Sequence, residues 1–275
     1  MKEINVKSWE DFEAELKVLL DYRSNLKKKS DLSVSELLFR GQSDSTKKLE
    51  TTLDRYVDCK ISLDRYYRII FRAKPQIETF TKNEWNLPSL NDYVKKIKDP
   101  GMSTVEKLNK DEYEYMAYIR HHGFPSPLLD WTYSPYLAAY FAINNIAKDV
   151  ENISVYAYLE DIGAGKSTTS AKPWIHRLAP YVKTHARHFL QQSRYTVCME
   201  MTVDNVYYAK HEDVFYLNNT KQDLLWKYNL PASERIKVLQ KLDMMNINSY
   251  SLFGTEDSLM DMVAKREFLL KEMNL

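Results

Sequence analysis

Residues 121–135 bring together side chains that can bind and polarise a ligand, in the order His-His-Gly-Phe-Pro-Ser-Pro-Leu-Leu-Asp-Trp-Thr-Tyr-Ser-Pro. Two leucines form a short buried run, and the residues from Asp130 to Ser134 follow it directly. Serine caps helices and proline fits the first helical turn, so a helix is predicted from Pro135 to about Lys148. The backbone N–H groups and positive dipole end of such a helix start favour an anion or a polar ligand. A capped core helix without a ligand explains the same pattern.

Length, charge and cysteine content set limits on the class of protein. With 275 residues the chain can bury a sizeable core, and one elaborated α+β domain over residues 1–275 is favoured. Its 39 basic and 38 acidic side chains neither indicate nor exclude a nucleic-acid partner. Cys59 and Cys198 are too few for a disulfide framework or a zinc site. No apolar run has membrane-spanning length and no signal peptide is evident, so a cytoplasmic protein without membrane contact is predicted.

Apolar periodicity and capping residues predict the order of helices and strands. Helices are expected over residues 8–22, 51–57, 62–72, 105–120, 135–148, 185–192, 231–244 and 256–270. Strands are expected over residues 36–39, 153–158, 195–201, 214–217 and 224–228, with residues 40–42 at a turn. The stretch containing Pro75, Pro88 and Pro100 is expected to be irregular. This order predicts an α+β fold, with an N-terminal helical region over 1–35, a core over 36–229 and C-terminal helices over 230–275.

Two short motifs lack the spacing that their chemistry needs. Residues 165–167, Gly-Lys-Ser, resemble the end of a phosphate-binding loop, but that loop needs a glycine where Glu160 stands. Lys166 is therefore expected to point into water. His121 and His122 diverge on a helix, and no second pair of ligands accompanies them at helical spacing, so no metal site is expected. Backbone hydrogen bonds at a helix end are the favoured role of these two histidines.

The segment from Ile162 to Met199 contains no acidic residue and is locally basic. Such a segment favours a polyanion, although pairing of its cations with acids elsewhere in the chain would explain the composition as well. Arg187 and Gln191 are four residues apart on one helical face, so both can reach one ligand. The cationic and histidine residues of the segment are Lys166, Lys172, Arg177, Lys183, Arg187, Arg194, His176, His185 and His188.

Several separate motifs resemble the FRG domain family, which is named for a Phe-Arg-Gly signature that Gln usually follows, as in residues 39–42 here. Residues 121–125 are similar to the family's His-Tyr-Gly-Leu-Pro, and residues 128–135 resemble its central signature. Residues 187–192 resemble the start of its Arg-x-x-x-Gln-Gln-Gly-x-Phe segment. Residues 230–253 resemble its C-terminal helix and Leu-Phe segment, so the likeness spans nearly the whole chain.

The chain departs from the family pattern at a few positions. Ser126 and Pro127 stand where the family commonly has Thr-Arg, Ser193 where it has Gly, and Tyr195 where it has Phe. The missing arginine alters how an anionic ligand is held.

The order of these motifs is similar, more distantly, to the layout of ADP-ribosyltransferases. That resemblance implies an ADP-ribosyltransferase-like mixed β core flanked by the terminal helices, with NAD as co-substrate and no metal. In such enzymes an arginine holds NAD and a serine segment fixes its nicotinamide half. An acidic or equivalent polar residue near a third motif stabilises an oxocarbenium-like transition state. A guanidinium binds phosphate through two hydrogen bonds, and the reaction needs little beyond positioning and well-placed charge.

Carried over to this chain, the resemblance assigns Arg40 to anchor NAD, Tyr133 to stack on nicotinamide and Ser134 to bond the adjoining ribose. Gln191 or Gln192 would face the reacting carbon. The candidate NAD-binding residues are Arg40, Gly41, Gln42, His121, Thr132, Tyr133 and Ser134. The candidate catalytic residues are Arg40, Asp130, Ser134, Arg187, Gln191 and Gln192.

No glutamate occupies the third-motif position, so the identity of the acid stays open between Asp130, Glu112 and Glu114. A buried pair of Arg40 and Asp130 is expected, because pairing would neutralise both charges and hold two distant segments together.

The resemblance implies an NAD-dependent ADP-ribosyltransferase that modifies nucleic acid, with RNA favoured over single-stranded DNA. By analogy with related transferases, the protein would be a toxin of a bacterial toxin-antitoxin or anti-phage module, held inactive by an antitoxin or other inhibitory partner. The acid-free segment and the 20 tyrosines suit a single strand, through phosphate contacts and base stacking. Two alternatives remain: a transferase that modifies protein, and a nucleotide-binding sensor without turnover.

Overall fold

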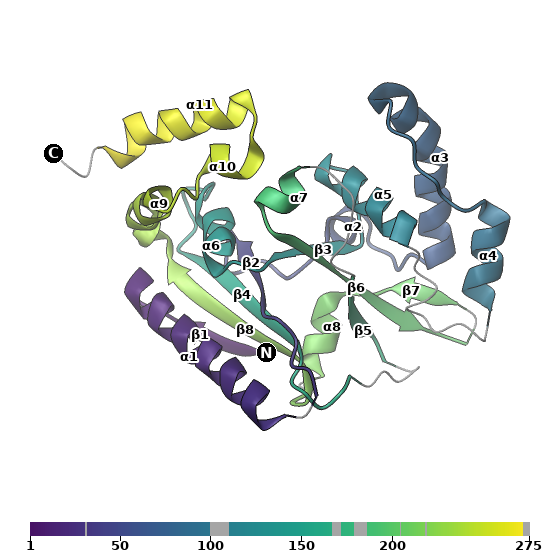
Figure 1. Ribbon diagram of the computed structural model, residues 1–275, viewed down its shortest axis with the longest axis horizontal. Coiled ribbons are helices and arrows are strands. Elements are labelled where there is room, and N and C mark those ends of the chain that lie inside the picture. The colour runs from purple at the N-terminus through teal and green to yellow at the C-terminus, as the bar shows by residue number, and fades with distance from the viewer. Residues whose placement is uncertain are drawn as a thin grey trace.

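The computed structural model describes residues 1–30, 32–99, 110–166, 172–178, 186–203, 205–217 and 219–271. A sheet runs through the middle of the molecule and helices pack against it (Figure 1). The strands are β1 (Lys2–Asn5), β2 (Leu38–Gln42), β3 (Leu128–Thr132), β4 (Asn152–Asp161), β5 (Trp174–Arg177), β6 (Ser193–Met201), β7 (Val206–Tyr208) and β8 (Gln222–Pro231). The helices are α1 (Trp9–Lys29), α2 (Thr52–Tyr56), α3 (Leu63–Thr81), α4 (Leu90–Lys98), α5 (Lys110–His121), α6 (Pro135–Ile143), α7 (Arg187–Leu190), α8 (His211–Tyr216), α9 (Arg235–Met244), α10 (Ser249–Phe253) and α11 (Glu256–Lys265), with a 3-10 turn η1 (Ala232–Glu234) and a π-helical turn η2 (Arg266–Leu270).

The eight strands form one sheet in the order β1-β8-β4-β2-β3-β6-β5, and β7 pairs with β6. β1 runs parallel to β8, and the other strand pairs are antiparallel. The first strand therefore lies beside the last, with Lys2 opposite Trp226. A mostly antiparallel sheet with helices between and after its strands confirms the predicted α+β class.

The sheet is nearly divided between β2 and β3. These two strands share a single register pair, Phe39 opposite Thr132. By contrast, β2 pairs with β4 along all of residues 38–42, and β3 pairs with β6 along all of residues 128–132. Since the backbones of β2 and β3 meet at one point and then separate, side chains have to fill the space between them. We call this place the split.

Two helical layers cover one face of the sheet, one over each side of the split. Helices α1, α6 and α9 pack over β2, β4 and β8, against side chains that include Phe39 and Tyr228. Helices α3, α4 and α5 pack over β3 and β6, against side chains that include Leu128 and Tyr195. The opposite face carries a third core, to which α8 contributes Phe215. The boundary between the two helical layers therefore lies over the split.

Helix α6 lies very close to β2 at Gly41. A Cβ atom at this position would lie 2.0 Å from the backbone oxygen of Ala138 and 2.6 Å from the backbone nitrogen of Ala142. Only glycine permits that approach. Residues 40–42 continue the strand, with Gln42 still paired opposite Ser154, so the turn predicted for them is wrong. The glycine is required by helix packing and not by a bend in the chain.

The helix after the central motif begins as predicted. Pro135 is its first residue, and the Oγ of Ser134 accepts a hydrogen bond from the backbone N–H of Leu137 at 3.3 Å. The helix ends at Ile143, earlier than the predicted Lys148, because the chain turns there to enter β4. The strands predicted over 153–158, 195–201 and 224–228 lie within β4, β6 and β8 and are confirmed.

The strand predicted over residues 214–217 is wrong, because residues 211–216 form α8. Val214 and Phe215 are adjacent and both buried, whereas a one-sided strand would bury alternate residues. A short apolar run by itself does not distinguish a strand from a buried helix.

The region around Pro75 is also more regular than predicted, since α3 passes through this proline and continues to Thr81. A proline inside a helix removes one backbone hydrogen bond. The face of α3 that carries Tyr66, Tyr67 and Ile70 is buried, and this packing outweighs the lost bond. Pro100 and residues 105–109 lie outside the described residues.

Lys166 is an ion-paired residue and does not point into water as predicted. Its Nζ lies 2.7 Å from the buried carboxylate of Asp223 and 3.2 Å from that of Glu160. It also donates to the backbone oxygen of Ile175 at 2.5 Å. The lysine therefore joins the ends of β4, β5 and β8, a role that depends on residues far apart in the sequence.

Candidate functional site

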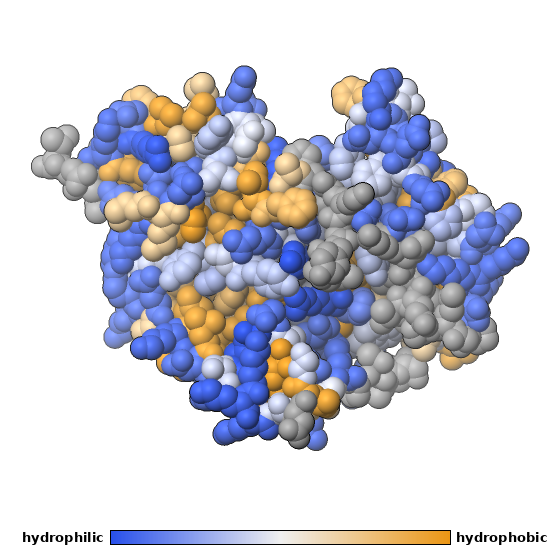
Figure 2. Space-filling model, in the orientation of Figure 1, coloured by the Kyte–Doolittle hydropathy of each residue, from blue (hydrophilic) through white to orange (hydrophobic). Residues whose placement is uncertain are grey.

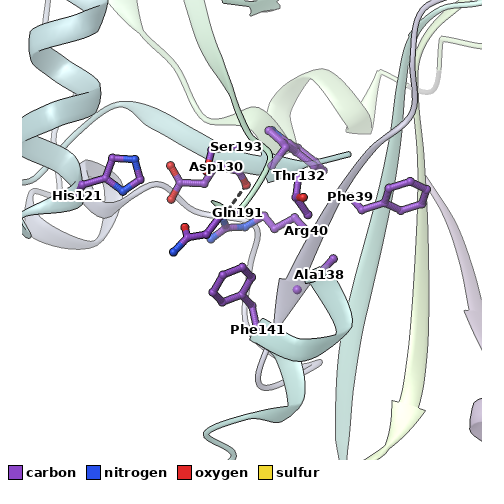
Figure 3. Close-up of a pocket in the computed structure, with 11 residues that line it drawn as sticks. Phe39, Arg40, His121, Asp130, Thr132, Ala138, Phe141, Gln191 and Ser193 are labelled. Carbon is purple, nitrogen blue, oxygen red and sulfur yellow. Dashed lines mark hydrogen bonds between the residues drawn. The ribbon is translucent and has the colours of Figure 1, made fainter. Parts of the chain in front are cut away.

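A cavity of about 240 Å3 lies at the split. The cavity lies between the two helical layers, and side chains from the strands and helices on either side of the split line it (Figure 3). The lining residues are Phe39, Arg40, Gly41, His121, Asp130, Trp131, Thr132, Ala138, Phe141, Gln191 and Ser193. Six of the residues predicted from sequence are among them: Arg40, Gly41, His121, Asp130, Thr132 and Gln191.

Arg40 bridges the split from the side of β2. One terminal guanidinium nitrogen donates to the backbone oxygen of Asp130 at 2.9 Å, as the dashed line in Figure 3 marks. The Nε of Arg40 is buried and has no hydrogen-bond partner among the described residues. Burial lowers the pKa of the Arg40 guanidinium to about 10, partly opposed by the negative charge of Asp130, so Arg40 stays charged at neutral pH. The cavity thus holds a fixed positive charge with unused donor capacity.

The predicted ion pair of Arg40 with the Asp130 carboxylate is wrong, because Arg120 holds that carboxylate. The Nε of Arg120 donates to Oδ1 of Asp130 at 2.5 Å and a terminal nitrogen donates to Oδ2. The remaining terminal nitrogen donates to Oγ1 of Thr52 at 2.8 Å. Burial by itself raises the pKa of Asp130, but the charge and hydrogen bonds of Arg120 outweigh burial and hold it below its usual value. Asp130 is therefore ionised and committed to α5.

His121 stands at the opposite wall of the cavity and belongs to a chain of aromatic side chains. Its Nε2 lies 2.7 Å from the hydroxyl of Tyr195, and the same hydroxyl lies 3.2 Å from Nδ1 of His188. Burial lowers the pKa of His188 to about 4, so this histidine is neutral at physiological pH. Burial also raises the pKa of Tyr195 far above its usual value. Tyr195, which stands where the related family has Phe, therefore links α5 to α7 by hydrogen bonds.

Helix α7 is attached to the C-terminal helices rather than being turned wholly toward the cavity. The guanidinium carbon of Arg187 lies 5.4 Å from the ring centroid of Phe253 in α10, and the amide of Gln191 donates to the backbone oxygen of Leu252 at 3.3 Å. The ring of Phe253 also meets that of Phe141, which lines the cavity, edge to face at 6.2 Å. Gln191 lines the cavity and Arg187 packs on Phe253, and the hypothesis that the two residues reach one ligand stays a prediction.

The mouth of the cavity is partly apolar. Figure 2 shows apolar side chains gathered over α10 and α11 on the face of the molecule that it displays. Phe141, which lines the cavity, is 36% exposed. A charged interior with an aromatic rim suits a ligand that carries both phosphate and a flat ring.

One part of the chain matches a known protein family. Residues 35–151 match the family model described as FRG domain. We call this part of the chain the FRG-domain region. Neither a curated protein nor a solved structure matches the chain. The resemblance read from residues 39–42 and 121–135 is thereby confirmed over the matched range.

The FRG-domain region contributes most of the residues that line the cavity. Nine lining residues, from Phe39 to Phe141, lie inside the matched range, whereas Gln191 and Ser193 come from the chain beyond it. The glycine of the Phe-Arg-Gly signature lets α6 approach β2, and the arginine spans the split. The signature is thus explained by one structural feature, the junction at which β2, α6 and β3 meet.

The other residues predicted from sequence do not line the cavity at the split. Ser134 caps α6, and the Oγ1 of Thr132 accepts from the backbone N–H of Ser134 at 3.2 Å. Gln192 adopts a left-handed backbone conformation, with a φ of 48°, directly before β6. Tyr133 is covered on one ring face by the guanidinium of Arg194, with its carbon 4.3 Å from the ring centroid. Gln42 ends β2 opposite Ser154.

Of the three candidate acids, Asp130 is the one that lines the cavity at the split. Glu112 is buried in α5 among the aromatic residues of the second core, and its carboxylate lies 3.6 Å from Nζ of Lys96. Glu114 also lies on α5 and is not among the lining residues. Within the described part of the chain, no group of three or more His, Cys, Asp or Glu residues is placed to hold a metal ion, and no helix is long and apolar enough to cross a membrane.

Sequence reasoning missed Arg120, the residue that decides the charge state of Asp130. Its position directly before the His121-His122 pair gave a usable signal, because it puts a cation in the last turn of α5, next to a predicted site residue. Phe141 and Ser193 were missed as well. Nothing in their local sequence indicates that they face the cavity, since their place depends on how the two sides of the split pack.

Proposed function

We propose that this FRG-domain chain is an NAD-dependent ADP-ribosyltransferase that modifies nucleic acid, with RNA preferred over DNA. The observation that carries the proposal is Arg40, a partly buried and charged guanidinium that forms no ion pair with the described carboxylates and whose Nε has no hydrogen-bond partner among the described residues. The charge of Asp130 offsets the cost of burying Arg40 only in part, and a phosphate that accepts two hydrogen bonds would offset the rest. The pyrophosphate of NAD is the anion that the resemblance to ADP-ribosyltransferases implies.

The shape of the cavity fits part of a dinucleotide. Pockets that enclose a whole drug-sized ligand measure roughly 300–1,000 Å3. A cavity of about 240 Å3 fits one half of NAD, with the other half lying along the rim. Arg40 would hold the phosphates, and Thr132 and Gln191 offer polar groups for a ribose. When bound, NAD supplies the glycosidic bond to nicotinamide that breaks in the reaction.

The charges around the cavity support a role in positioning more than in proton transfer. Asp130 is ionised, so it places negative charge beside the cavity, where a developing positive charge on the ribose would be stabilised. Arg120 occupies both of its oxygens, however, so Asp130 is poorly placed to accept a proton. That feature favours the second candidate function, a sensor that binds the nucleotide without turnover.

The acceptor is proposed to be nucleic acid because of the cations near the cavity. Arg177 and Arg194 form no ion pair with any carboxylate of the described chain, which fits a polyanion better than pairing within the protein. A transferase with this target would be harmful to its own cell, so we include in the proposal a toxin role and an inhibitory partner such as an antitoxin. A protein acceptor is the competing outcome of the test.

The test is incubation with NAD labelled in its adenylate half and separate pools of single-stranded RNA, single-stranded DNA and protein. Label is expected in the RNA pool. Arg40→Ala should abolish transfer, and Arg40→Lys should not restore it, because an ammonium lacks the two-pronged geometry of the guanidinium. Arg68→Ala, which removes an exposed arginine of α3, is the matched control and should keep full activity.

The other outcomes separate the competing proposals. Label in the protein pool would replace the nucleic-acid acceptor with a protein. NAD binding that requires Arg40, without label in any pool and without release of nicotinamide, would favour the sensor. Full transfer by a folded Arg40→Ala protein would refute the proposed anchor.

A further inference from the structure

Tyr133 contacts two arginines on the sheet face that carries the third core. The guanidinium carbon of Arg194 lies 4.3 Å from the centroid of the Tyr133 ring, and that of Arg177 lies 5.4 Å from it. A terminal nitrogen of Arg177 also donates to the Tyr133 hydroxyl. These three residues come from β5, from β6 and from the end of β3, so the sheet itself fixes their relative positions. We call them the arginine–tyrosine stack.

The stack carries two positive charges that form no ion pair with a carboxylate of the described residues. Neither arginine has a carboxylate partner in the part of the chain that is described. Arg194 uses one terminal nitrogen for the backbone oxygen of Ser193 at 2.7 Å, and its buried Nε has no hydrogen-bond partner there. Neighbouring like charges repel, and the tyrosine ring offsets this only in part. Two oriented guanidinium groups with donors to spare are what an anionic phosphate requires.

The stack lies beside the cavity and outside its lining. Arg194 is paired in register with Trp131, and Ser193, the residue before Arg194, lines the cavity with Trp131. Tyr133 is not part of that lining. A ligand enclosed in the cavity is held by Arg40, so an anion on the stack belongs to a molecule that approaches from outside. Since Arg194 covers a face of the tyrosine ring, the stack is suited to a phosphate more than to a stacked base.

We propose that Arg177, Tyr133 and Arg194 form a phosphodiester subsite that holds the backbone of a single-stranded nucleic-acid acceptor beside the cavity. The inference rests on the proposed function for the identity of the acceptor. It divides the basic segment predicted from sequence into working parts: Arg177 and Arg194 bind phosphate, Arg187 packs on α10, and Lys166 is committed to Asp223. Lys183 and His185 lie outside the described residues. Backbone contacts of this kind carry no sequence information, so the subsite binds different base sequences alike.

The test measures binding of a fluorescein-labelled single-stranded RNA of twelve nucleotides by anisotropy, without NAD, over a series of salt concentrations. Arg177→Gln and Arg194→Gln should each weaken binding about three- to ten-fold and reduce the slope of log affinity against log salt by about 0.7. Tyr133→Phe keeps the ring under Arg194 but loses the hydroxyl that orients Arg177, so a smaller loss is expected. All-uridine and all-adenosine strands should show the same losses.

Two controls isolate the phosphate contact. Arg68→Gln removes the same charge from exposed α3 and should leave affinity and salt slope unchanged. A strand of the same bases on an uncharged peptide backbone should bind all variants equally. Thermal unfolding of each variant shows whether it is folded, and Tyr133→Phe provides a milder change if an arginine variant does not fold.

The outcomes distinguish this inference from the proposed function. Unchanged affinity and salt slope in folded Arg177→Gln and Arg194→Gln proteins would overturn the subsite. So would a loss of NAD binding with RNA binding intact, since the stack would then serve the co-substrate. If the variants lose RNA binding as expected but the wild-type protein transfers no label from NAD, the subsite stands and the transferase proposal fails.

Discussion

Arg120 binds both carboxylate oxygens of Asp130, and this pair ties the last turn of α5 to the middle of β3. The side chain of Arg120 is 8% exposed, so its charge depends on Asp130 for compensation. Arg40 approaches the same residue from the other side of the split and binds its backbone oxygen alone. Of these two arginines, Arg120 is paired with the Asp130 carboxylate, and Arg40 forms no ion pair with a carboxylate of the described residues.

The pair of Arg120 and Asp130 should matter for stability, and Arg40 should not. Asp130→Asn leaves the buried Arg120 without its partner, and because the Asp130 side chain is 38% exposed, the free energy of unfolding should fall by about 1–3 kcal/mol, less than for a fully buried pair. Arg40→Gln removes a partly buried charge that forms no ion pair with a described carboxylate, so stability should be unchanged or should rise. Urea unfolding followed by circular dichroism measures both.

The same two variants test the division of roles in function. Arg40→Gln should lose NAD binding, measured by calorimetry, while it unfolds no earlier than the wild type. A large loss of stability in Arg40→Gln would show that Arg40 is a structural residue whose charge the protein itself satisfies. The reverse result for Asp130→Asn, an unchanged stability, would show that the pair with Arg120 contributes little.

The parts of the fold that could be predicted are those encoded locally. The Ser134-Pro135 cap and the strong apolar character of the next residues specified α6, and alternation specified β4 and β6. Short elements were missed because their pattern is weak: β1 is mostly exposed, and β7 has three residues. The strand predicted at 214–217 failed because an apolar run is shared by strands and buried helices.

The site shows the same limit. The motif resemblance predicts that Arg40, His121, Asp130 and Gln191 belong to one site, and the structure places all of them around one cavity. The partner of each charged side chain could not be predicted. Arg40 and Arg120 both contact Asp130, and which of them binds its carboxylate depends on how far β2 and β3 separate. Charge assignments therefore require the three-dimensional arrangement.

Gly41→Ala should disrupt the junction of β2 and α6. The new Cβ would lie 2.0 Å from the backbone oxygen of Ala138, and backbone cannot move aside as a flexible side chain can. Overpacking of this kind costs about 1–3 kcal/mol or more, and the shift of α6 should also weaken NAD binding. Gly123→Ala is the matched control, since a Cβ there meets nothing within 4 Å and only its φ of 89° opposes the change. Equal stability of the two variants, by thermal unfolding, would contradict the close packing.

Stability should fall as the solution becomes mildly acidic, because of buried histidines. Burial lowers the pKa of His188 to about 4 and that of His211 to about 3, whereas an unfolded histidine titrates near 6.5. As the pH falls below about 6.5, the unfolded chain takes up protons that the folded chain does not, so unfolding becomes more favourable. The pKa of Asp130 is lowered, so its pair with Arg120 persists through this window and is lost only at lower pH.

The measurement is the melting temperature between about pH 7 and about pH 4.5. The wild type should lose stability steadily over this range, and His188→Gln should lose less, because one of the two responsible groups is gone. His188→Gln also removes a partner of the Tyr195 hydroxyl, so its melting temperature at pH 7 serves as the reference for its own series. An equal pH dependence in both proteins would show that His188 is protonated in the folded state.

Phe253 should control the cavity from the C-terminal helices. The centroid of its ring lies 5.4 Å from the guanidinium carbon of Arg187 and 6.2 Å from the ring centroid of Phe141. Phe253 therefore connects α7 to the part of α6 that lines the cavity. Phe253→Ala removes both contacts and leaves the hydrogen bond from Gln191 to Leu252 as the main link between α7 and α10. We expect amide hydrogen exchange to rise in α7 and NAD binding to weaken several-fold, with a loss of stability of about 1–2 kcal/mol.

Phe268→Ala is the control, because this ring is 79% exposed, and it should change neither hydrogen exchange in α7 nor NAD binding. If Phe253→Ala speeds exchange in α7 but leaves NAD affinity intact, the C-terminal helices support the fold without shaping the cavity. Unchanged exchange in α7 would show that Gln191 and the Tyr195 hydroxyl are sufficient to hold this helix in place.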